Sequence, residues 1–196
     1  SVGEYRIEVA GIHDNISGHA DKIAARFGYT EGLKDVSLEY ALPLNTNKTS
    51  LVVGANYSES SVIEEPFNVI GIRSETQRYF IGLSHPFYSR PSGYFSGSIL
   101  LEQAESRSFL LDNMPFELSP GATNGLANVS VARLANEWLW KSENKVLALR
   151  SRFSVGLDTG GATINGVDAA GNEIPDGEFV SWLGQFQWLS RLGWRH

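Results

Sequence analysis

The chain has 196 residues, a net charge of -6 and no cysteine. Its mild acidity argues against nucleic-acid binding, which requires a basic surface, and the lack of cysteine excludes disulfides, thiol nucleophiles and cysteine-based zinc sites. No apolar run approaches the roughly 18 residues of a transmembrane helix, and no charged-then-apolar signal segment follows Ser1. We interpret both ends as truncations, so the missing targeting signals carry no information about location.

The dominant pattern is an alternation of apolar and polar residues with a period of two, which is typical of β-strands. In the second segment, for example, Ile23, Ala25 and Phe27 fall on one face, and Lys22 and Arg26 fall on the other. Helical periodicity is weak throughout, and even 131–141 alternates better as a strand. Nine segments are predicted: 3–12, 21–30, 34–43, 50–58, 74–85, 93–105, 127–140, 145–157 and 178–190.

Charged residues indicate which face of each segment meets water. Four segments carry two of these charges each, and in all four the pair shares a face. The full set on this face is Arg6, Glu8, Lys22, Arg26, Glu39, Arg78, Glu102, Arg133, Glu137, Arg150 and Arg152. In a membrane barrel this face would line the water-filled lumen. The charges would then keep the lumen soluble and pair across strands, or they would form a polar conduit or seats for a plug. Their mixed signs, with Arg26 near Glu39 and Arg133 near Glu137, suit the passage of a chain without adhesion rather than a strongly ion-selective pore.

Two features favour a membrane barrel over a soluble β-sandwich, whose strands also alternate. The segments match the roughly 9–11 tilted residues that cross a bilayer. Aromatic residues also gather near the segment ends, as interfacial girdles require: Tyr29, Tyr57, Tyr94, Trp138, Trp140 and Trp188. We therefore predict an all-β fold, an antiparallel up-and-down transmembrane β-barrel of which residues 1–196 form one partial domain.

The connections between segments support the same topology. Long connections are expected at 59–73, 106–126 and 158–177, and short ones at 45–49, 88–92 and 142–144. Outer-membrane barrels place long loops outside the cell and short turns in the periplasm. Pro43 and Pro86 are expected to end strands at the periplasmic side, because proline cannot donate a hydrogen bond to a ladder.

Three stretches near the start of the chain resemble a known family, the two-partner secretion transporters or haemolysin activation/secretion proteins. Gly3-Glu4-Tyr5-Arg6 resembles the glycine-aromatic-arginine strand of that family. The stretch 14–21 resembles its Asn-Pro-Leu-Gly-x-Gly-Asp turn through Asn15, Gly18 and Asp21, with Ala20 in place of the second glycine. Tyr40-Ala41-Leu42-Pro43-Leu44 is similar to its Ser-Tyr-x-x-Pro-Leu strand end.

The resemblance implies a bacterial outer-membrane pore that exports an unfolded partner protein, such as an adhesin or a haemolysin. The chain would cover about strands 2 to 10 of a 16-stranded barrel, monomeric when full length, with no cofactor. Its partners would be the secreted protein and the lipid bilayer. The family's periplasmic POTRA domains and lumen-inserted loop are not in this sequence. An insertase of the same superfamily or a passive porin therefore remains an alternative, and a soluble β-sandwich binding module remains a second one.

No other motif indicates catalysis or metal binding, so we do not expect an enzyme. Asp158-Thr159-Gly160 resembles an aspartic-protease triplet, but the paired aspartate and its apolar strand are missing. The four histidines, His13, His19, His85 and His196, lack the spacing of metal ligands. The acidic loop with Asp158, Asp168, Glu173, Asp176 and Glu178 could supply oxygen ligands for calcium, although a solvated loop explains it more simply.

Overall fold

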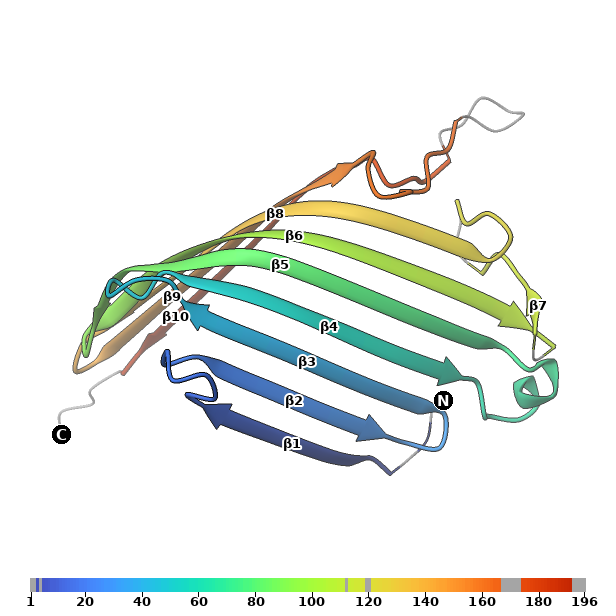
Figure 1. Cartoon of the computed structure of the whole chain (residues 1–196), viewed down its shortest axis with the longest axis horizontal. Coiled ribbons are helices and arrows are strands. Elements are labelled where there is room, and N and C mark those ends of the chain that lie inside the picture. The colour runs from blue at the N-terminus through green and yellow to red at the C-terminus, as the bar shows by residue number, and fades with distance from the viewer. Residues whose placement is uncertain (1–2, 4, 112, 119–120, 167–173, 192–196) are drawn as a thin grey trace.

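The computed structural model describes residues 3, 5–111, 113–118, 121–166 and 174–191. These residues form one curved antiparallel sheet in which strands adjacent in sequence are adjacent in space, apart from one short strand (Figure 1). The strands are β1 (Ile7–Asp14), β2 (Lys22–Tyr29), β3 (Leu33–Pro43), β4 (Ser50–Ser61), β5 (Arg73–Arg90), β6 (Gly93–Leu110), β7 (Met114–Pro115), β8 (Leu126–Lys141), β9 (Lys145–Leu157) and β10 (Val180–Ser190). The predicted all-β, up-and-down antiparallel fold is confirmed.

The sheet is open, with β1 and β10 at its two edges. The short strand β7 pairs with the end of β6, so the sheet has ten strands rather than the nine predicted. In the described part of the chain there is one 3-10 helix, η1 (Phe67–Ile70), which lies in the connection between β4 and β5. Among the described residues, no helix has the length and apolar character needed to cross a membrane.

The long connections lie at one end of the sheet together with the short β2–β3 turn, and the other short connections lie at the opposite end. In Figure 1 the turns after β1, β3, β5 and β8 lie together at the left, and the connections after β4, β6 and β9 lie at the right. We call these the turn end and the loop end. The chain therefore runs back and forth between the turn end and the loop end.

The middle strands are longer than predicted, and the proline in β5 does not end that strand. β5 continues through Pro86 to Arg90, leaving only Pro91 and Ser92 for the turn where 88–92 was predicted. The register shifts between Pro86 and Tyr88, so Phe87 is the extra residue of a β-bulge. A bulge accommodates proline because the ladder is already interrupted there. Pro43, in contrast, does end β3 as predicted.

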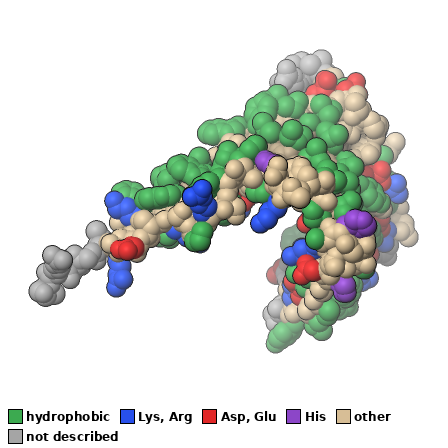
Figure 2. Space-filling view, turned by 60° about the vertical axis from the view of Figure 1, so that its left-hand side comes forward, with side chains coloured by type: hydrophobic (Ala, Val, Ile, Leu, Met, Phe, Trp, Pro, Cys, Tyr) green, Lys and Arg blue, Asp and Glu red, His purple; other side chains and the backbone are tan. Residues whose placement is uncertain are grey.

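The sheet has two faces of opposite character and no second layer within the described residues. Figure 2 shows hydrophobic side chains covering the convex side, while charged side chains project from the underside into the hollow. Many large apolar side chains of the convex side are strongly exposed, for example Trp182 at 72% and Leu134 at 52%. A soluble sandwich would cover such a face with a second sheet, and the described residues contain none.

Candidate functional site on the charged face

The register of the strands places all eleven charged residues selected from the sequence on one face. Residues paired across successive strands share a face, so each row of the ladder can be followed across the sheet. One such row runs from Arg26 through Ser37 and Asn56 to Arg78, and the next runs from Glu39 through Gly54 and Phe80 to Glu102. We call this the charged face and the opposite one the apolar face.

The sign of the charge alternates over four rows of this face, after which the row of Arg152 is basic like the row of Arg133 before it. Four consecutive rows carry Glu8 with Asp35, Arg26 with Arg78, Glu39 with Glu102, and Lys22 with Arg133. The last of these rows also contains Asp14, opposite Lys22. Successive rows on one face are two residues apart, roughly 7 Å. Each basic row therefore has an acidic row within reach of its long side chains, and the face neutralises much of its own charge.

Glu102 on β6 is the most enclosed member of this set. Its side chain is 5% exposed and lies between two arginines from the neighbouring strands: Arg133 Nη2 is 2.8 Å from Glu102 Oε1, and Arg78 Nη1 is 3.5 Å from Oε2. Arg133 also donates a hydrogen bond to Ser154 Oγ on β9. One carboxylate thus links β5, β6 and β8, and Arg133 extends the network to β9.

A second ion pair joins β8 to β9 and corrects one expectation. Glu137 pairs with Arg150, whose Nε is 2.7 Å from Oε1, and it accepts a hydrogen bond from the Tyr94 hydroxyl. Arg133 and Glu137 are therefore not partners, because residues four apart along one strand are too distant to touch. Tyr94 also lies on the charged face, so its assignment to an outer aromatic girdle was wrong.

Asp35 is a member of the charged face that the sequence selection missed. Its carboxylate Oδ1 lies 2.6 Å from Arg6 Nη2, and the same Arg6 atom is 3.3 Å from Glu8 Oε2. Gly28 separates β1 from β3 in this row, and a Cβ at Gly28 would lie 2.5 Å from the Arg6 guanidinium. The glycine therefore leaves the space in which the pair forms. The position of Asp35 in the alternation, two residues before Ser37 and four before Glu39, was the signal that could have found it.

The remaining members are exposed and form no ion pair among the described residues, although Arg26 lies near Glu39 as predicted. The salt bridges of the described residues do not include one between Arg26 and Glu39, and none involves Lys22 or Arg152. Around Arg26 and Glu39 the face is hollowed by small residues, with Ala10, Ala24 and Ser37 lining an open depression of about 360 Å³. Arg26 and Glu39 therefore both border this open depression.

Four charged residues of the predicted segments lie on the apolar face within the described strands. They are Lys34, Glu75, Glu105 and Lys145, which fall in rows with apolar-face residues or alternate with them along the strand. Lys145 begins β9 at the turn end, whereas the other three lie toward the loop end, where Glu59, Arg73 and Arg107 join them on the same face. The apolar face is therefore polar at this end, and the expectation that charges occupy a single face holds only for the eleven residues selected.

The turn motif Asn15, Gly18 and Asp21 forms a hydrogen-bonded turn between β1 and β2. The Asn15 side chain accepts the Ala20 N–H at 2.8 Å, and the Asp21 carboxylate accepts the Ser17 N–H at 3.0 Å. Asp21 is fully buried. Burial raises the pKa of its carboxyl group, but hydrogen bonds from Ser17 and Tyr40 together lower the pKa by more than burial raises it. The pKa of Asp21 therefore lies below its ordinary value. Gly18 and Ala20 both have positive φ, 83° and 57°.

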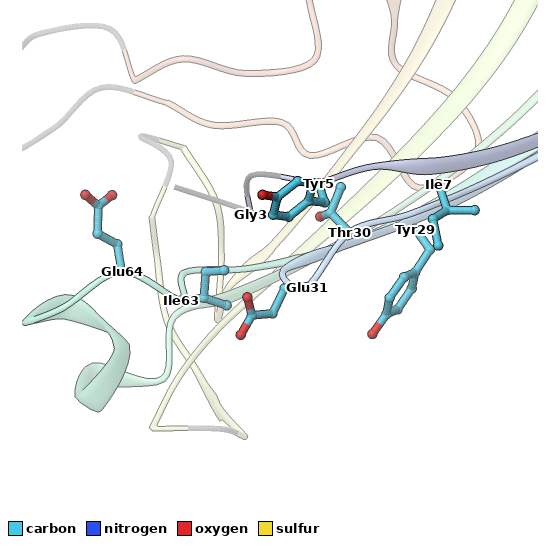
Figure 3. Close-up of a pocket in the computed structure, with 8 residues that line it drawn as sticks. All are labelled: Gly3, Tyr5, Ile7, Tyr29, Thr30, Glu31, Ile63 and Glu64. Atoms are coloured by element: carbon cyan, nitrogen blue, oxygen red, sulfur yellow. The ribbon is translucent and has the colours of Figure 1, made fainter.

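The pocket in Figure 3 lies at the loop end, beside the edge strand β1. Its lining includes Tyr5 and Ile7 near the start of the chain, Tyr29 and Glu31 around the turn between β2 and β3, and Glu64 after β4. The carboxylates of Glu31 and Glu64 point in different directions in this view and do not converge. The arrangement contains no pair of acids positioned for proton transfer.

The acidic loop after β9 is only partly described. Asp168 and Glu173 lie outside the described residues, while Asp158, Asp176 and Glu178 lie within them. In the described part of the chain, no group of three histidine or acidic residues is placed to hold a metal ion. Thr159 and Gly160 of the protease-like triplet form a turn over β6 and β8, where their carbonyl groups accept hydrogen bonds from Ser130 and Gln103.

Comparison with known proteins gives one informative match. No protein-family model and no curated protein matches the chain. Among solved structures, the chain is similar to CdiB from Escherichia coli, with a TM-score of 0.70 and 16% sequence identity over 93% of this chain. The chain spans only 33% of the length of CdiB. At this identity the similarity concerns the fold, and the sheet has the fold of part of an up-and-down β-barrel wall.

Proposed function

We propose that the chain forms part of the wall of a pore in a bacterial outer membrane, and that the pore exports an unfolded partner protein by two-partner secretion. The observation that carries the proposal is the single sheet with two opposite faces. One face carries the eleven charges, and the other exposes large apolar side chains such as Trp182 and Leu134. Such a sheet is stable where lipid covers one face and water fills the space on the other.

The direction of export follows from the two ends of the sheet. Barrels of the outer membrane have long loops outside the cell and short turns in the periplasm. The loop end, with the connections after β4, β6 and β9, would therefore face the cell exterior, and the hydrogen-bonded turn with Asn15 and Asp21 would face the periplasm. The eleven charged residues would line the conduit between these two compartments.

Two-partner secretion is favoured by the fold and by the chemistry of the charged face. CdiB, whose fold the sheet shares, is a two-partner secretion transporter of the outer membrane. Rows of alternating sign give a passing polypeptide no extended field of one sign to adhere to. The proposal needs no cofactor and assigns no catalytic activity to the chain. In this proposal the complete protein is a monomeric barrel that contacts the lipid bilayer and the secreted partner protein.

A cross-linking experiment tests the proposal with two alanines of β8. Ala135 lies on the charged face, in the row of Ser98 and Arg152, and Ala132 lies on the apolar face, in the row of Leu101 and Val155. Ala135→Cys and Ala132→Cys would be made in the complete gene encoding this chain. The candidate partner would be a large secreted protein whose gene adjoins this one; halted by fusion to a tightly folded domain, it would carry one cysteine in its translocating segment. A thiol cross-linker should join the partner to position 135 and not to position 132.

The cross-linking result can contradict the conduit, and further measurements separate the alternatives. Equal cross-linking at both positions, or none while the partner is still secreted, would contradict the conduit. A passive porin would conduct ions in planar bilayers without any dependence of secretion on the gene. An insertase would instead be required for the assembly of other outer-membrane barrels.

A further inference from the structure

The edges of the apolar surface run obliquely across the rows of the sheet. We define the apolar belt as the stretch of each strand whose apolar-face side chains are mostly apolar or aromatic; on β8 and β9 it includes the polar residues Asn136 and Ser151. On β2 the belt reaches from Ile23 to Tyr29, and on β8 it reaches from Ala132 to Trp140. If the edges of the belt were parallel to the rows, these two stretches would lie in the same rows.

Toward the loop end, the belt retreats from one strand to the next. Tyr29 on β2 lies in the row that continues through Lys34, Glu59 and Glu75 to Arg107 on β6. On β6 the last belt residue is Leu101, six residues before Arg107, and Ala132 on β8 shares the row of Leu101. The loop-side edge therefore moves by six residues over the five steps from β2 to β8.

Toward the turn end, the belt advances in the same direction. Ile23 on β2 lies in the row that leads through Tyr40, Val53 and Ile81 to Leu101 on β6. Trp140 on β8 pairs with Gly93, eight residues from Leu101, and Leu147 and Trp188 continue that row on β9 and β10. Both edges thus move together, by about one to two residues per strand.

This drift has the magnitude expected for strands that cross a bilayer at an angle. With a rise of about 3.3 Å per residue and a spacing of about 4.8 Å between strands, the drift corresponds to a tilt of roughly 40–50°. Transmembrane barrels have strand tilts of about 35–45°. A belt edge set by a flat membrane would cross the rows at this angle, whereas a packing surface within a soluble protein has no reason to do so.

A turn covers polar side chains at the loop-side edge of the belt. On β6 and β8 the first apolar-face residues beyond the belt are Gln103 and Ser130, which share a row. The carbonyl groups of Thr159 and Gly160 accept hydrogen bonds of 2.8 Å from Ser130 and Gln103. The turn therefore satisfies polar groups where the lipid headgroups would begin, a level at which unpaired polar groups are costly.

We infer that the bilayer boundary crosses the sheet obliquely, so that residues of one row lie at different depths. Acyl chains would contact the apolar belt, and the loop ends of β4, β5, β6 and β8 would project beyond the membrane with Glu59, Glu75, Glu105 and Arg107 exposed to water. The inference rests on the proposed membrane function, and it adds the depth of each strand.

Two pairs of single cysteines test the inference in the complete protein, in a background without other cysteines. In the loop-side pair, Val36 on β3 and Glu105 on β6 share one row through Tyr57 and Gln77. In the turn-side pair, Thr49 lies beside His85, which leads through Gly97 and Asn136 to Ser151 on β9. The turn-side pair is matched in chemistry, because both native side chains carry a hydroxyl group.

The first probe is a membrane-impermeant maleimide, applied to isolated outer membranes that are open on both sides. The second is brominated lipid in reconstituted vesicles, which quenches a fluorophore attached at a cysteine in contact with acyl chains. Oblique crossing predicts that Glu105→Cys and Thr49→Cys react many-fold faster with the maleimide than Val36→Cys and Ser151→Cys, and that only the latter two are quenched. Equal depth within each pair would overturn the oblique boundary while leaving the pore in place. Rapid labelling and no quenching at all four positions would contradict the membrane function itself.

Discussion

The carboxylate of Glu102 lies 2.8 Å from the Arg133 guanidinium on the neighbouring strand, and only 5% of its side chain is exposed. With Arg78 on the other side, this carboxylate is the one enclosed charge among the described salt bridges of the charged face; both arginines remain more accessible, at 24% and 45%. Removing the negative charge would leave two arginines facing one another across β6. This geometry makes Glu102 the position at which the charged face is most sensitive to substitution.

Glu102→Gln is therefore expected to destabilise the folded barrel by about 1–3 kcal/mol. Breaking a fully buried pair costs roughly 3–5 kcal/mol, and the partial exposure of the two arginines reduces that figure. Glu137→Gln is the matched control. Its pair with Arg150 is 38% and 54% exposed, so its loss should cost less than about 1 kcal/mol. Urea unfolding of the two variants in detergent, followed by the heat-dependent gel shift of the barrel, measures the difference. Equal midpoints would show that the enclosure of Glu102 has no energetic consequence.

Ala20→Gly is expected to stabilise the turn between β1 and β2. Ala20 has a φ of 57°, in the left-handed region that costs a residue with a Cβ roughly 1–2 kcal/mol and costs glycine little. The greater freedom of glycine in the unfolded chain offsets part of the gain, leaving up to about 1 kcal/mol. Ala24→Gly, within β2, should have the opposite sign, because its extended backbone gains nothing from glycine. A lower unfolding midpoint for Ala20→Gly would contradict the conformation of the turn.

The same turn predicts a dependence on pH through Asp21. Its carboxyl pKa is lowered in the folded protein, so the folded state favours the ionised form. The resulting stabilisation is complete above the unfolded pKa of about 3.9, and it is lost as the pH falls through the lower folded value. The melting temperature of Asp21→Asn should lie below that of the native protein at pH 7, and the gap should narrow as the pH falls below about 4. A gap that stays constant over this range would show that ionised Asp21 does not hold the turn.

Much of the fold could be predicted because a sheet with one face in water and one apolar face requires polar and apolar residues to alternate along each strand. One clear example is β2, where Ile23, Ala25 and Phe27 alternate with Lys22 and Arg26. Because paired residues share a face, the register carries this division across the neighbouring strands. The loop ends of β5 and β6 could not be predicted in the same way. Near Thr76 and Ser106 both faces are polar, and such a stretch has the composition of a loop.

The contacts between side chains of the charged face could be identified only from the register of the paired strands. The sequence placed Arg133 and Glu137 on one face, but only the pairing of β8 with β6 and β9 shows that their partners are Glu102 and Arg150. The bulge at Phe87 was also hidden, because Pro86 on its own indicates the end of a strand. Lys34 was overlooked because the position at which the apolar face becomes polar differs from strand to strand.

The assignment of the two faces leads to a last prediction, which uses adjacent residues of β9. Leu149 lies on the apolar face between Trp138 and Phe186, and Ala148 lies on the charged face between Leu139 and Gln187. Leu149→Arg should reduce the amount of assembled barrel, because a charge on the lipid face costs roughly 2–4 kcal/mol at the midplane and less toward the interface. Ala148→Arg should assemble normally, since its guanidinium would reach the water-filled side. Heat-modifiable bands from purified outer membranes compare the two variants at equal expression. If Ala148→Arg lost as much folded protein as Leu149→Arg, the apolar face would not be the one in contact with lipid.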